Sequence, residues 1–276
     1  MRELYPFQVE GVDYLLQRKS WGKGYVGGML WDDPGLGKTT QAIVAAHRIG
    51  EYPVLVVCPN ALKLHWAREI RAIVPGARVT VATVGGRFRK WSQSAGKTLE
   101  VTPSQDRLAA LKADWVIVHY AGIRISQAGY ASIDWSTVII DEAHYIKNRN
   151  AARTRALMEV TPDSAHRIGL TATPWSKEPS GLWSQLHWMA PQVDGLSNYW
   201  RWFGLFVDFR WEELRDPKTG KVIRRYRKVV GGKNLDALAE VMSHYGRCRT
   251  KEQVAPQLPS MTRTRMPLEL SGRQKV

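Results

Sequence analysis

The sequence predicts an α/β protein with a central, mostly parallel sheet flanked by helices. Short apolar runs recur along the first two thirds of the chain, and several are too continuously apolar to face water. Longer amphipathic stretches, such as 40–49 and 61–73, separate these runs. Strands buried on both faces and joined by helices are typical of parallel sheets, whose ligand-binding residues lie at the carboxyl ends of the strands.

Six apolar runs are the predicted strands of this sheet, at residues 26–30, 54–58, 78–82, 116–120, 138–140 and 167–170. Residues 85–105 interrupt the alternation with glycine and basic residues, which predicts an exposed basic loop or a short insertion. After Pro174 the chain changes character and predicts mostly helical structure. A turn at 216–221 then separates two β-like arms, the second of which spans 222–230.

The part of the chain after Pro174 is rich in tryptophan. It contains Trp175, Trp183, Trp188, Trp200, Trp202 and Trp211. They fall at helical spacing among leucine, methionine and phenylalanine, which is the pattern of a helix face that packs into a core. Exposed tryptophans would instead serve as platforms for nucleic-acid bases. The spacing favours the core interpretation for this group.

Composition restricts the function classes. With 276 residues and 44% hydrophobic residues the chain can bury a core, and no apolar run reaches the length needed to cross a bilayer. Only two cysteines occur, Cys58 and Cys248, which excludes a disulfide scaffold and a cysteine-rich zinc site. We therefore expect an intracellular, reducing setting and no membrane partner.

The formal net charge of +15 is unevenly distributed along the chain. Residues 1–200 hold 23 basic and 17 acidic side chains, whereas residues 201–276 hold 17 basic and 8 acidic ones. A surplus of this size favours a polyanionic partner, with nucleic acid ahead of an acidic membrane surface. The alternative is a basic face that is merely solvated.

A phosphate-binding loop is predicted in the segment DDPGLGKT, directly after the first predicted strand. A phosphate requires converging backbone N–H groups, and hence glycines, together with a lysine for the β- and γ-phosphates and a hydroxyl for Mg²⁺. These groups are supplied, in that order, by Gly35, Gly37, Lys38 and Thr39. The strict pattern has glycine where Asp32 stands, so a glycine turn that only caps a helix is the alternative for this segment alone.

A second motif, DEAH, follows the predicted strand 138–140. Asp141 at the strand terminus can hold the Mg²⁺ shell, and Glu142 beside it can orient and polarise a water molecule for in-line attack. Taken alone, such an acidic pair more commonly complements the dipole of a helix N-terminus. Its position about a hundred residues after a phosphate-binding loop, within alternating α/β sequence, favours the catalytic interpretation.

A third segment, GLTATP, runs from the predicted strand 167–170 into Thr171 and Thr173. These two hydroxyls are suited to relay between a nucleotide and a nucleic-acid track, although the segment alone is an ordinary strand-to-turn junction. Together the three motifs predict one site. In it, the amides around 35–39 and the acids at 141–142 face each other across a magnesium-bound triphosphate.

In this order the motifs resemble the first RecA-like lobe of superfamily 2 helicase-like ATPases, specifically the SWI/SNF-type branch of double-stranded-DNA translocases. The resemblance covers nearly the whole chain. It rests on LYPFQVEG from residue 4, GGML with DDPGLGKT from 27, VCPN from 57, residues 116–120, DEAHYIKN from 141, GLTATP from 169 and LWSQL from 182. In this branch a further segment leads from the first lobe toward the second. It is matched by GGKN from 231, Arg247, Arg249, Lys251, Leu258 and Pro259.

The resemblance implies ATP and Mg²⁺ as cofactors and DNA, double-stranded, as the partner. It assigns the phosphates to Lys38 and the loop amides, with nucleotide contacts at Gly35, Leu36, Gly37, Thr39 and Thr40. It assigns Mg²⁺ to Thr39 and Asp141, water activation to Glu142 and adenine to Gln8. It assigns coupling between the nucleotide and the DNA track to His144, Thr171 and Thr173.

The resemblance also implies a division of the chain into three parts: a RecA-like ATP-binding lobe over 1–190, a helical and basic hairpin protrusion of the same lobe over 191–260, and the start of a linker over 261–276. In the family a second RecA-like lobe, in the same chain or in trans, supplies an arginine that is worth about 10³- to 10⁵-fold in rate. We therefore expect the 276-residue chain to bind ATP·Mg²⁺ but to hydrolyse it feebly.

DNA contacts are predicted at Lys63, His65, Arg124, Arg224, Arg225, Arg227 and Lys228. The first three lie near motifs that touch phosphates in the family, with a solvated face as an equal alternative. The other four, on the hairpin arm, would grip the DNA backbone without reading bases.

Two other functions are alternatives to a DNA translocase. An RNA-directed superfamily 2 helicase is disfavoured by the predicted helices after GLTATP and by the basic residues around Arg247, Arg249 and Lys251. A non-catalytic DNA-binding module that keeps ATP as a structural ligand is disfavoured by the intact Lys38, Asp141 and Glu142.

Overall fold

The computed structural model describes residues 3–17, 26–82, 112–162, 165–175, 179–193, 195–254 and 256, together with the backbone of 88–92 and 97–101. Its main sheet contains β1 (Gly27–Leu30), β2 (Val54–Cys58), β3 (Val79–Ala82), β4 (Phe88–Ser92), β5 (Lys97–Val101), β6 (Trp115–His119), β7 (Thr137–Asp141), β8 (His166–Leu170) and β11 (Gly246–Arg247). Within the described residues the strand order is β11-β1-β8-β7-β2-β6-β3-β4-β5. All neighbours from β11 to β3 are parallel, which confirms the predicted α/β class.

The central strand β2 shows why its sequence is apolar throughout. Leu55 and Val57 pack into the core on one face of the sheet, whereas Val54 and Val56 pack into the core on the other face. None of these side chains has measurable exposure. A strand in this position has no polar side, so its residues do not alternate.

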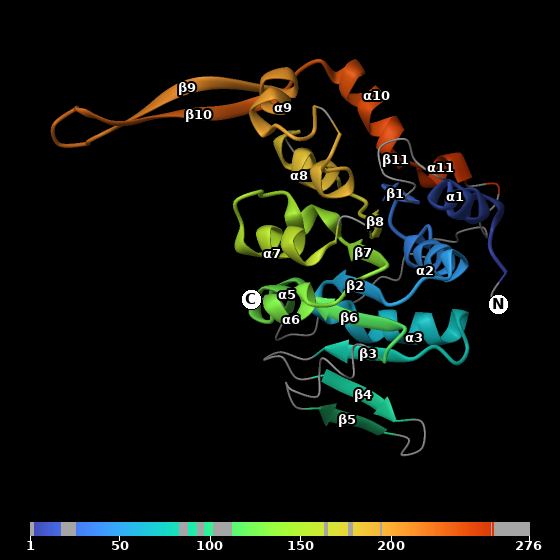
Figure 1. Ribbon diagram of the computed structural model, residues 1–276. Helices are drawn as coiled ribbons and strands as arrows, with labels where there is room; N and C mark the ends of the chain where they lie inside the picture. The colour runs from blue at the N-terminus through green and yellow to red at the C-terminus, as the bar shows by residue number, and fades with distance from the viewer. Residues whose placement is uncertain are drawn as a thin grey trace, which may run out of the picture.

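Helices cover both faces of the sheet (Figure 1). One face is covered by α1 (Pro6–Leu16), α2 (Lys38–Ile49) and α3 (Lys63–Ile73). The other face carries α5 (Tyr120–Ile125), α6 (Gln127–Ala131), α7 (Ala152–Val160), α8 (Ser180–Met189), α9 (Tyr199–Phe206) and α10 (Leu235–Tyr245). None of the helices in these ranges combines the length and the apolar composition that a bilayer crossing requires.

All six predicted strands are present, and their ends differ from the predicted ones by at most one residue. Predicted strand 116–120, for example, runs from Trp115 to His119, because Tyr120 already begins α5. Residues 85–105 were predicted as an exposed basic loop or a short insertion; the loop alternative is wrong for β4 and β5, which form an antiparallel pair that extends the sheet beyond β3. The free backbone groups at the edge of β3 thereby gain partners. The rest of that segment lies outside the described residues.

The predicted hairpin is confirmed by β9 (Val207–Arg215) and β10 (Val222–Gly232), which pair antiparallel and project from the body of the protein (Figure 1). Asp216 forms the turn between them, since its Oδ1 accepts hydrogen bonds from the amides of Lys218 and Thr219 at 2.7 and 2.9 Å. Beyond α10 the chain returns to the main sheet, where β11 pairs with β1. The predicted linker at 261–276 lies outside the described residues, and the predicted division at 190 stays a prediction.

Five of the six tryptophans divide into two groups, and the sixth, Trp175, is half-buried and packs against the core. The core prediction is confirmed for Trp183, Trp188 and Trp202, which are buried. It is wrong for Trp200 and Trp211, which are 55% and 61% exposed. Trp200 lies two positions from Trp202 on α9 and therefore faces the opposite side of the helix. Trp211 stands on the projecting hairpin, which has no core of its own.

Candidate nucleotide site

The three predicted motifs follow three adjacent strands of the sheet. β8 lies between β1 and β7, with Leu170 in register with Leu30 on one side and with Asp141 on the other. Because the strands are parallel, the chain leaves all three at the same edge. The phosphate-binding loop, the DEAH acids and the GLTATP turn are therefore brought together.

The phosphate-binding loop owes its shape to two glycines. Gly35 and Gly37 have φ angles of +88° and +72°, in the left-handed region that favours glycine. A Cβ on Gly37 would also lie 2.3 Å from Nε2 of Gln8. Helix α2 begins at the next residue, so its first amides point toward the loop and form an anion-binding N-terminus.

The predicted nucleotide residues line this loop in order. Leu36 and Thr40 are buried, and Thr39 is half-buried in the first turn of α2. Gln8 of α1 lies over the loop: its Nε2 donates to the Leu36 carbonyl at 3.3 Å and its Oε1 accepts from the Tyr5 amide at 3.1 Å. The assignment of adenine recognition to Gln8 stays a prediction.

Lys38 rests on the backbone that precedes the loop glycines. Its Nζ donates to the carbonyls of Asp32 and Asp33 at 2.5 and 3.1 Å. Burial lowers the pKa of the Lys38 ammonium, whereas the carboxylates of Asp32, Glu142, Asp141 and Asp33 act in the opposite direction. Lys38 is thus within electrostatic range of both DEAH acids.

Asp141 is a buried carboxylate held by directed hydrogen bonds. Trp66 donates its Nε1–H to Oδ2 at 2.8 Å, and the Glu142 amide donates to Oδ1 at 3.0 Å. Burial raises the pKa of the Asp141 carboxyl, while the bond from Trp66 lowers it. The Tyr120 hydroxyl donates to the Asp141 carbonyl at 2.7 Å and so fixes the end of β7.

Glu142 has an unusual backbone, with φ 52° and ψ 56°. A non-glycine residue in this left-handed region is strained, and such residues gather at functional sites. The turn directs the Glu142 side chain toward Thr171 and His144. Its Oε2 accepts from the Thr171 hydroxyl at 3.4 Å and lies 3.1 Å from Nδ1 of His144.

The residues predicted to couple the nucleotide to DNA form one cluster around Glu142. Nδ1 of His144 lies 3.0 Å from the Thr171 hydroxyl oxygen and 3.4 Å from that of Thr173. The Thr173 amide donates to the Thr171 hydroxyl at 3.1 Å. The turn at 171–173 is thus connected to the Glu142 carboxylate by hydrogen bonds.

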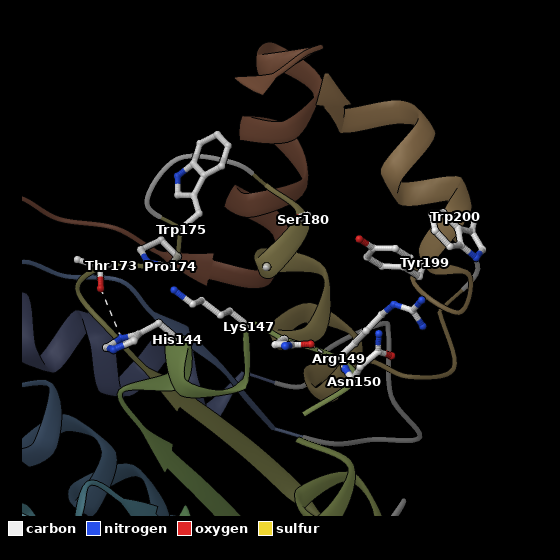
Figure 2. A pocket seen from close by; sticks show the side chains of 12 residues that line it. His144, Lys147, Arg149, Asn150, Thr173, Pro174, Trp175, Ser180, Tyr199 and Trp200 are labelled. Atoms are coloured by element: carbon white, nitrogen blue, oxygen red, sulfur yellow. Dashed lines mark hydrogen bonds between the residues drawn. The ribbon is translucent and has the colours of Figure 1, made fainter. Parts of the chain in front are cut away.

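A cavity of about 620 Å³ opens beside this cluster. Figure 2 shows His144 and Thr173 at one end of the cavity and Arg149, Tyr199 and Trp200 at the other. The Arg149 guanidinium stacks over the Tyr199 ring at 4.2 Å. Lys147 also lines the cavity, and among the described lining residues there is no carboxylate, so this part of the wall carries positive charge.

The donor set at the edge fits Mg²⁺. A threonine hydroxyl at residue 39 and the Asp141 carboxylate are the hard oxygen ligands that this ion prefers, and Mg²⁺ takes the rest of its shell from phosphates and water. In the described part of the chain no cluster of three His, Cys, Asp or Glu side chains could hold a metal ion by itself.

Comparisons with known proteins agree with the motif order. The sequence model of one protein family, the SNF2-related domain, matches residues 7–276 of this chain. The chain belongs to the SNF2-related domain family. It is 28% identical to mouse "DNA annealing helicase and endonuclease ZRANB3" over 97% of its own length and 23% of that protein. It is 30% identical to budding yeast "ISWI chromatin-remodeling complex ATPase ISW1" over 83% of its length and 19% of that protein.

A solved structure described as "Sulfolobus solfataricus SWI2/SNF2 ATPase core in complex with dsDNA" superposes with a TM-score of 0.66 at 23% identity. The match covers 94% of this chain and 47% of that one. This likeness confirms the predicted RecA-like fold. The chain spans less than a third of the length of curated relatives that it matches.

The residues predicted to touch DNA near α3 and α5 differ in exposure. Lys63 is buried and its Nζ donates to the Ala82 carbonyl at 2.7 Å, which weakens its prediction as a phosphate contact. His65 is exposed on α3. Arg124 is exposed and lines a second cavity, of about 530 Å³, with Asn60, His119 and other residues that follow β2 and β6.

Most of the predicted basic residues on the hairpin already have partners. Arg225 binds Glu213 at 2.8 Å and Lys228 binds Glu212 at 3.0 Å across the two strands. Arg227 lies over the rings of Trp200 and Trp211, at 4.8 and 5.0 Å from their centroids. The fourth of these predicted DNA contacts, Arg224, forms neither an ion pair nor a ring contact with the residues that the structure describes.

Two functional side chains were not predicted in the roles the structure indicates. Trp66 holds Asp141, and Arg249 holds Asp32 through an ion pair of 2.6 Å. The sequence carries one signal for the second contact: an aspartate in a buried loop requires a cation. Nothing in the sequence identifies which cation, since 217 residues separate the partners.

Proposed function

We propose that this chain is the ATP-binding lobe of a SWI/SNF-type DNA-directed ATPase, which hydrolyses ATP to ADP and phosphate to drive movement on double-stranded DNA. One observation supports the proposal above the others. The phosphate-binding loop, the DEAH acids and Thr171 leave three adjacent parallel strands at one edge, and Lys38 lies within electrostatic range of both acids.

Each residue has a role in this proposal. Lys38 and the first amides of α2 bind the triphosphate, and Gln8 selects adenine. Thr39 and Asp141 hold Mg²⁺, which supplies neutralisation of phosphate charge when bound. Glu142 orients and polarises the attacking water, and its strained backbone is typical of catalytic groups.

DNA is the proposed partner because of the net charge of +15 and because the solved SWI2/SNF2 relative is described in complex with dsDNA. A second RecA-like lobe, in the same polypeptide or in trans, would supply the arginine that stabilises the transferring phosphoryl group. Movement would follow from closure of the two lobes on ATP and their opening after hydrolysis. An intracellular location follows from this function.

The proposal is tested by separating nucleotide binding from hydrolysis. Lys38→Ala removes the cation at the phosphates, so we expect the affinity for ATP·Mg²⁺ to fall at least tenfold, by about 1.4 kcal/mol or more. Glu142→Gln keeps the shape of the side chain but removes the base. The affinity of Glu142→Gln for ATP·Mg²⁺ should stay within about threefold of that of the unsubstituted chain. Its single-turnover hydrolysis should be slower by about 10²- to 10⁴-fold. Isothermal titration calorimetry and rapid-quench assays measure the two quantities.

Matched controls are Lys221→Ala in the hairpin turn and Glu240→Gln on α10, both at exposed positions. Normal hydrolysis by Glu142→Gln contradicts the proposal. ATP binding with no hydrolysis in the unsubstituted chain, even with DNA and a second lobe supplied, indicates the non-catalytic module instead. Stimulation by RNA but not by duplex or single-stranded DNA indicates the RNA-directed helicase.

A further inference from the structure

The phosphate-binding loop is tied to the last described part of the chain by a buried ion pair. Asp32 has no exposed surface, and the Arg249 side chain is 11% exposed. Nη2 of Arg249 donates to Oδ2 of Asp32 at 2.6 Å and Nε donates to Oδ1 at 3.0 Å. The Arg249 amide also donates to Oδ1, at 3.1 Å. A two-point pair of this kind fixes both distance and orientation.

Arg249 also contacts the other parts of the nucleotide site. Nη2 donates to Oε1 of Gln41 on α2 at 2.9 Å, and Nη1 donates to the Phe7 carbonyl on α1. Nε2 of Gln41 in turn donates to the Leu36 carbonyl at 3.1 Å. One guanidinium therefore joins the adenine-side helix, the phosphate-binding loop and the helix that follows the loop.

The backbone around Arg249 repeats the same connection. Trp31 donates its amide to the Arg247 carbonyl at 2.7 Å, and Asp33 donates its amide to the Arg249 carbonyl at 2.9 Å. The Lys251 amide donates to Oδ2 of Asp33 at 2.9 Å. In Figure 1 the segment that carries β11 and α11 (Lys251–Val254) lies beside α1 and β1, although almost the whole chain separates them in sequence.

Side-chain packing closes the junction. Val254 of α11 forms a small buried cluster with Phe7 of α1 and Leu36 of the loop. Gly246 lies against the Trp31 ring, since a Cβ there would come within 2.7 Å of it. Residues 246–254, called here the exit segment, thus form one wall of the loop.

The consequence concerns Lys38. Its ammonium is held by the carbonyls of Asp32 and Asp33, the two residues whose carboxylates the exit segment binds. The exit segment therefore fixes the backbone that positions the phosphate-binding lysine. If the exit segment detaches, Asp32 becomes an unpaired buried charge and the loop must rearrange.

We propose that Arg249 is a positioning residue of the nucleotide site, and that docking of the exit segment onto the phosphate-binding loop is coupled to ATP binding. The inference rests on the proposed ATP-binding function. Because coupling is reciprocal, ATP must tighten the docking of the exit segment by the same factor by which docking tightens ATP binding.

The first test compares ATP·Mg²⁺ affinity in Arg249→Gln and Arg247→Gln, measured by calorimetry at a temperature where circular dichroism shows both folded. Arg247 is the matched control, because it lies two residues away and is exposed. We expect at least a tenfold loss for Arg249→Gln and less than twofold for Arg247→Gln. Arg249→Lys keeps the charge without the two-point contact and should fall between them.

A purely structural role is separated by the double variant Asp32→Asn with Arg249→Gln. If Arg249 acts by neutralising and orienting Asp32, the double variant should recover at least threefold of the lost affinity. Additive losses would overturn the proposal, as would unchanged affinity in Arg249→Gln.

Hydrogen exchange tests the coupling in the unsubstituted chain, which avoids any variant that fails to fold. ATP·Mg²⁺ should slow exchange of the Trp31, Asp33 and Lys251 amides at least fivefold, since all three bond across the junction. ATP binding without this protection overturns the coupling alone. Failure of the unsubstituted chain to bind ATP overturns the proposed function, and this inference with it.

Discussion

The nucleotide edge of the sheet and the β9–β10 hairpin both carry many charged side chains, but they hold those charges in opposite ways. At the edge, Asp32 and Asp141 are 0% and 8% exposed, and each accepts bonds from specific donors. On the hairpin, Glu212 and Glu213 pair with cations on an open surface, where water and salt screen the attraction. Burial, more than the number of charges, marks the region where one substitution changes function.

The largest expected difference concerns two tryptophans, one from the body and one from the hairpin. Trp202 is 2% exposed and donates its Nε1–H to the Pro179 carbonyl at 3.1 Å, so Trp202→Ala should lower the free energy of unfolding by about 3–5 kcal/mol. Trp211 is 61% exposed, so Trp211→Ala should cost about 1 kcal/mol or less, mainly through its contact with Arg227. Urea unfolding measures both. Equal losses would contradict the distinction between body and hairpin.

Asp141→Asn tests whether burial of charge at the edge serves function at the expense of stability. We expect single-turnover hydrolysis to fall about 100-fold or more. The free energy of unfolding should change by about 1 kcal/mol or less, because removal of the buried charge is offset by the asparagine NH2 group, which can accept a bond from neither Trp66 nor the Glu142 amide. Thermal unfolding and rapid-quench assays give the two values, with Asp236→Asn on exposed α10 as the control.

The sign of the pH dependence follows from the same carboxyl. Burial raises the pKa of Asp141 in the folded protein above its value in the unfolded chain. The folded state therefore binds the proton more tightly, and the contribution of Asp141 to stability decreases as pH rises through the interval between the two pKa values. Asp141→Asn should remove this part of the pH dependence. A pH profile of unfolding identical to that of the unsubstituted chain would contradict the interpretation.

The smallest expected effect concerns two arginines on β10. Arg225 is held by Glu213, whereas Arg224 has no such contact in the described part of the chain. If the hairpin grips duplex DNA, Arg224→Gln should lower the slope of log affinity against log salt by about 0.9, the value for one phosphate contact. Arg225→Gln should lower it by less. Fluorescence anisotropy with a labelled duplex at several salt concentrations measures both slopes, and equal changes would show that the ion pair does not restrain Arg225.

Local patterns in the sequence were sufficient for much of the fold and for the core of the site. Continuous apolar runs predict buried parallel strands, and the glycines of the phosphate-binding loop predict left-handed backbone before a helix. Parallel strands open at one edge, so the motifs that follow them are expected at that edge. The strand order, which places β8 between β1 and β7 and so brings Lys38, Asp141 and Thr171 together, comes from the structure.

What the sequence could not supply depends on contacts between distant segments. Arg249 and Asp32 are 217 positions apart, and no periodicity connects them. The hairpin was predictable from its turn, but the pairing of Arg225 with Glu213 depends on strand register. The antiparallel strands β4 and β5 were missed because their basic residues and the glycines next to them in the sequence resemble an exposed loop.

The position of β8 has a mechanical consequence. Because β8 is hydrogen-bonded to β1 on one side and to β7 on the other, the three strands form one stiff ladder that cannot shear without breaking several bonds at once. The loop that binds phosphate and the turn that carries Glu142 are thus anchored to a common rigid base. In the proposed mechanism, changes in the nucleotide would therefore be transmitted by the connections beyond the strand ends and not by sliding of these strands.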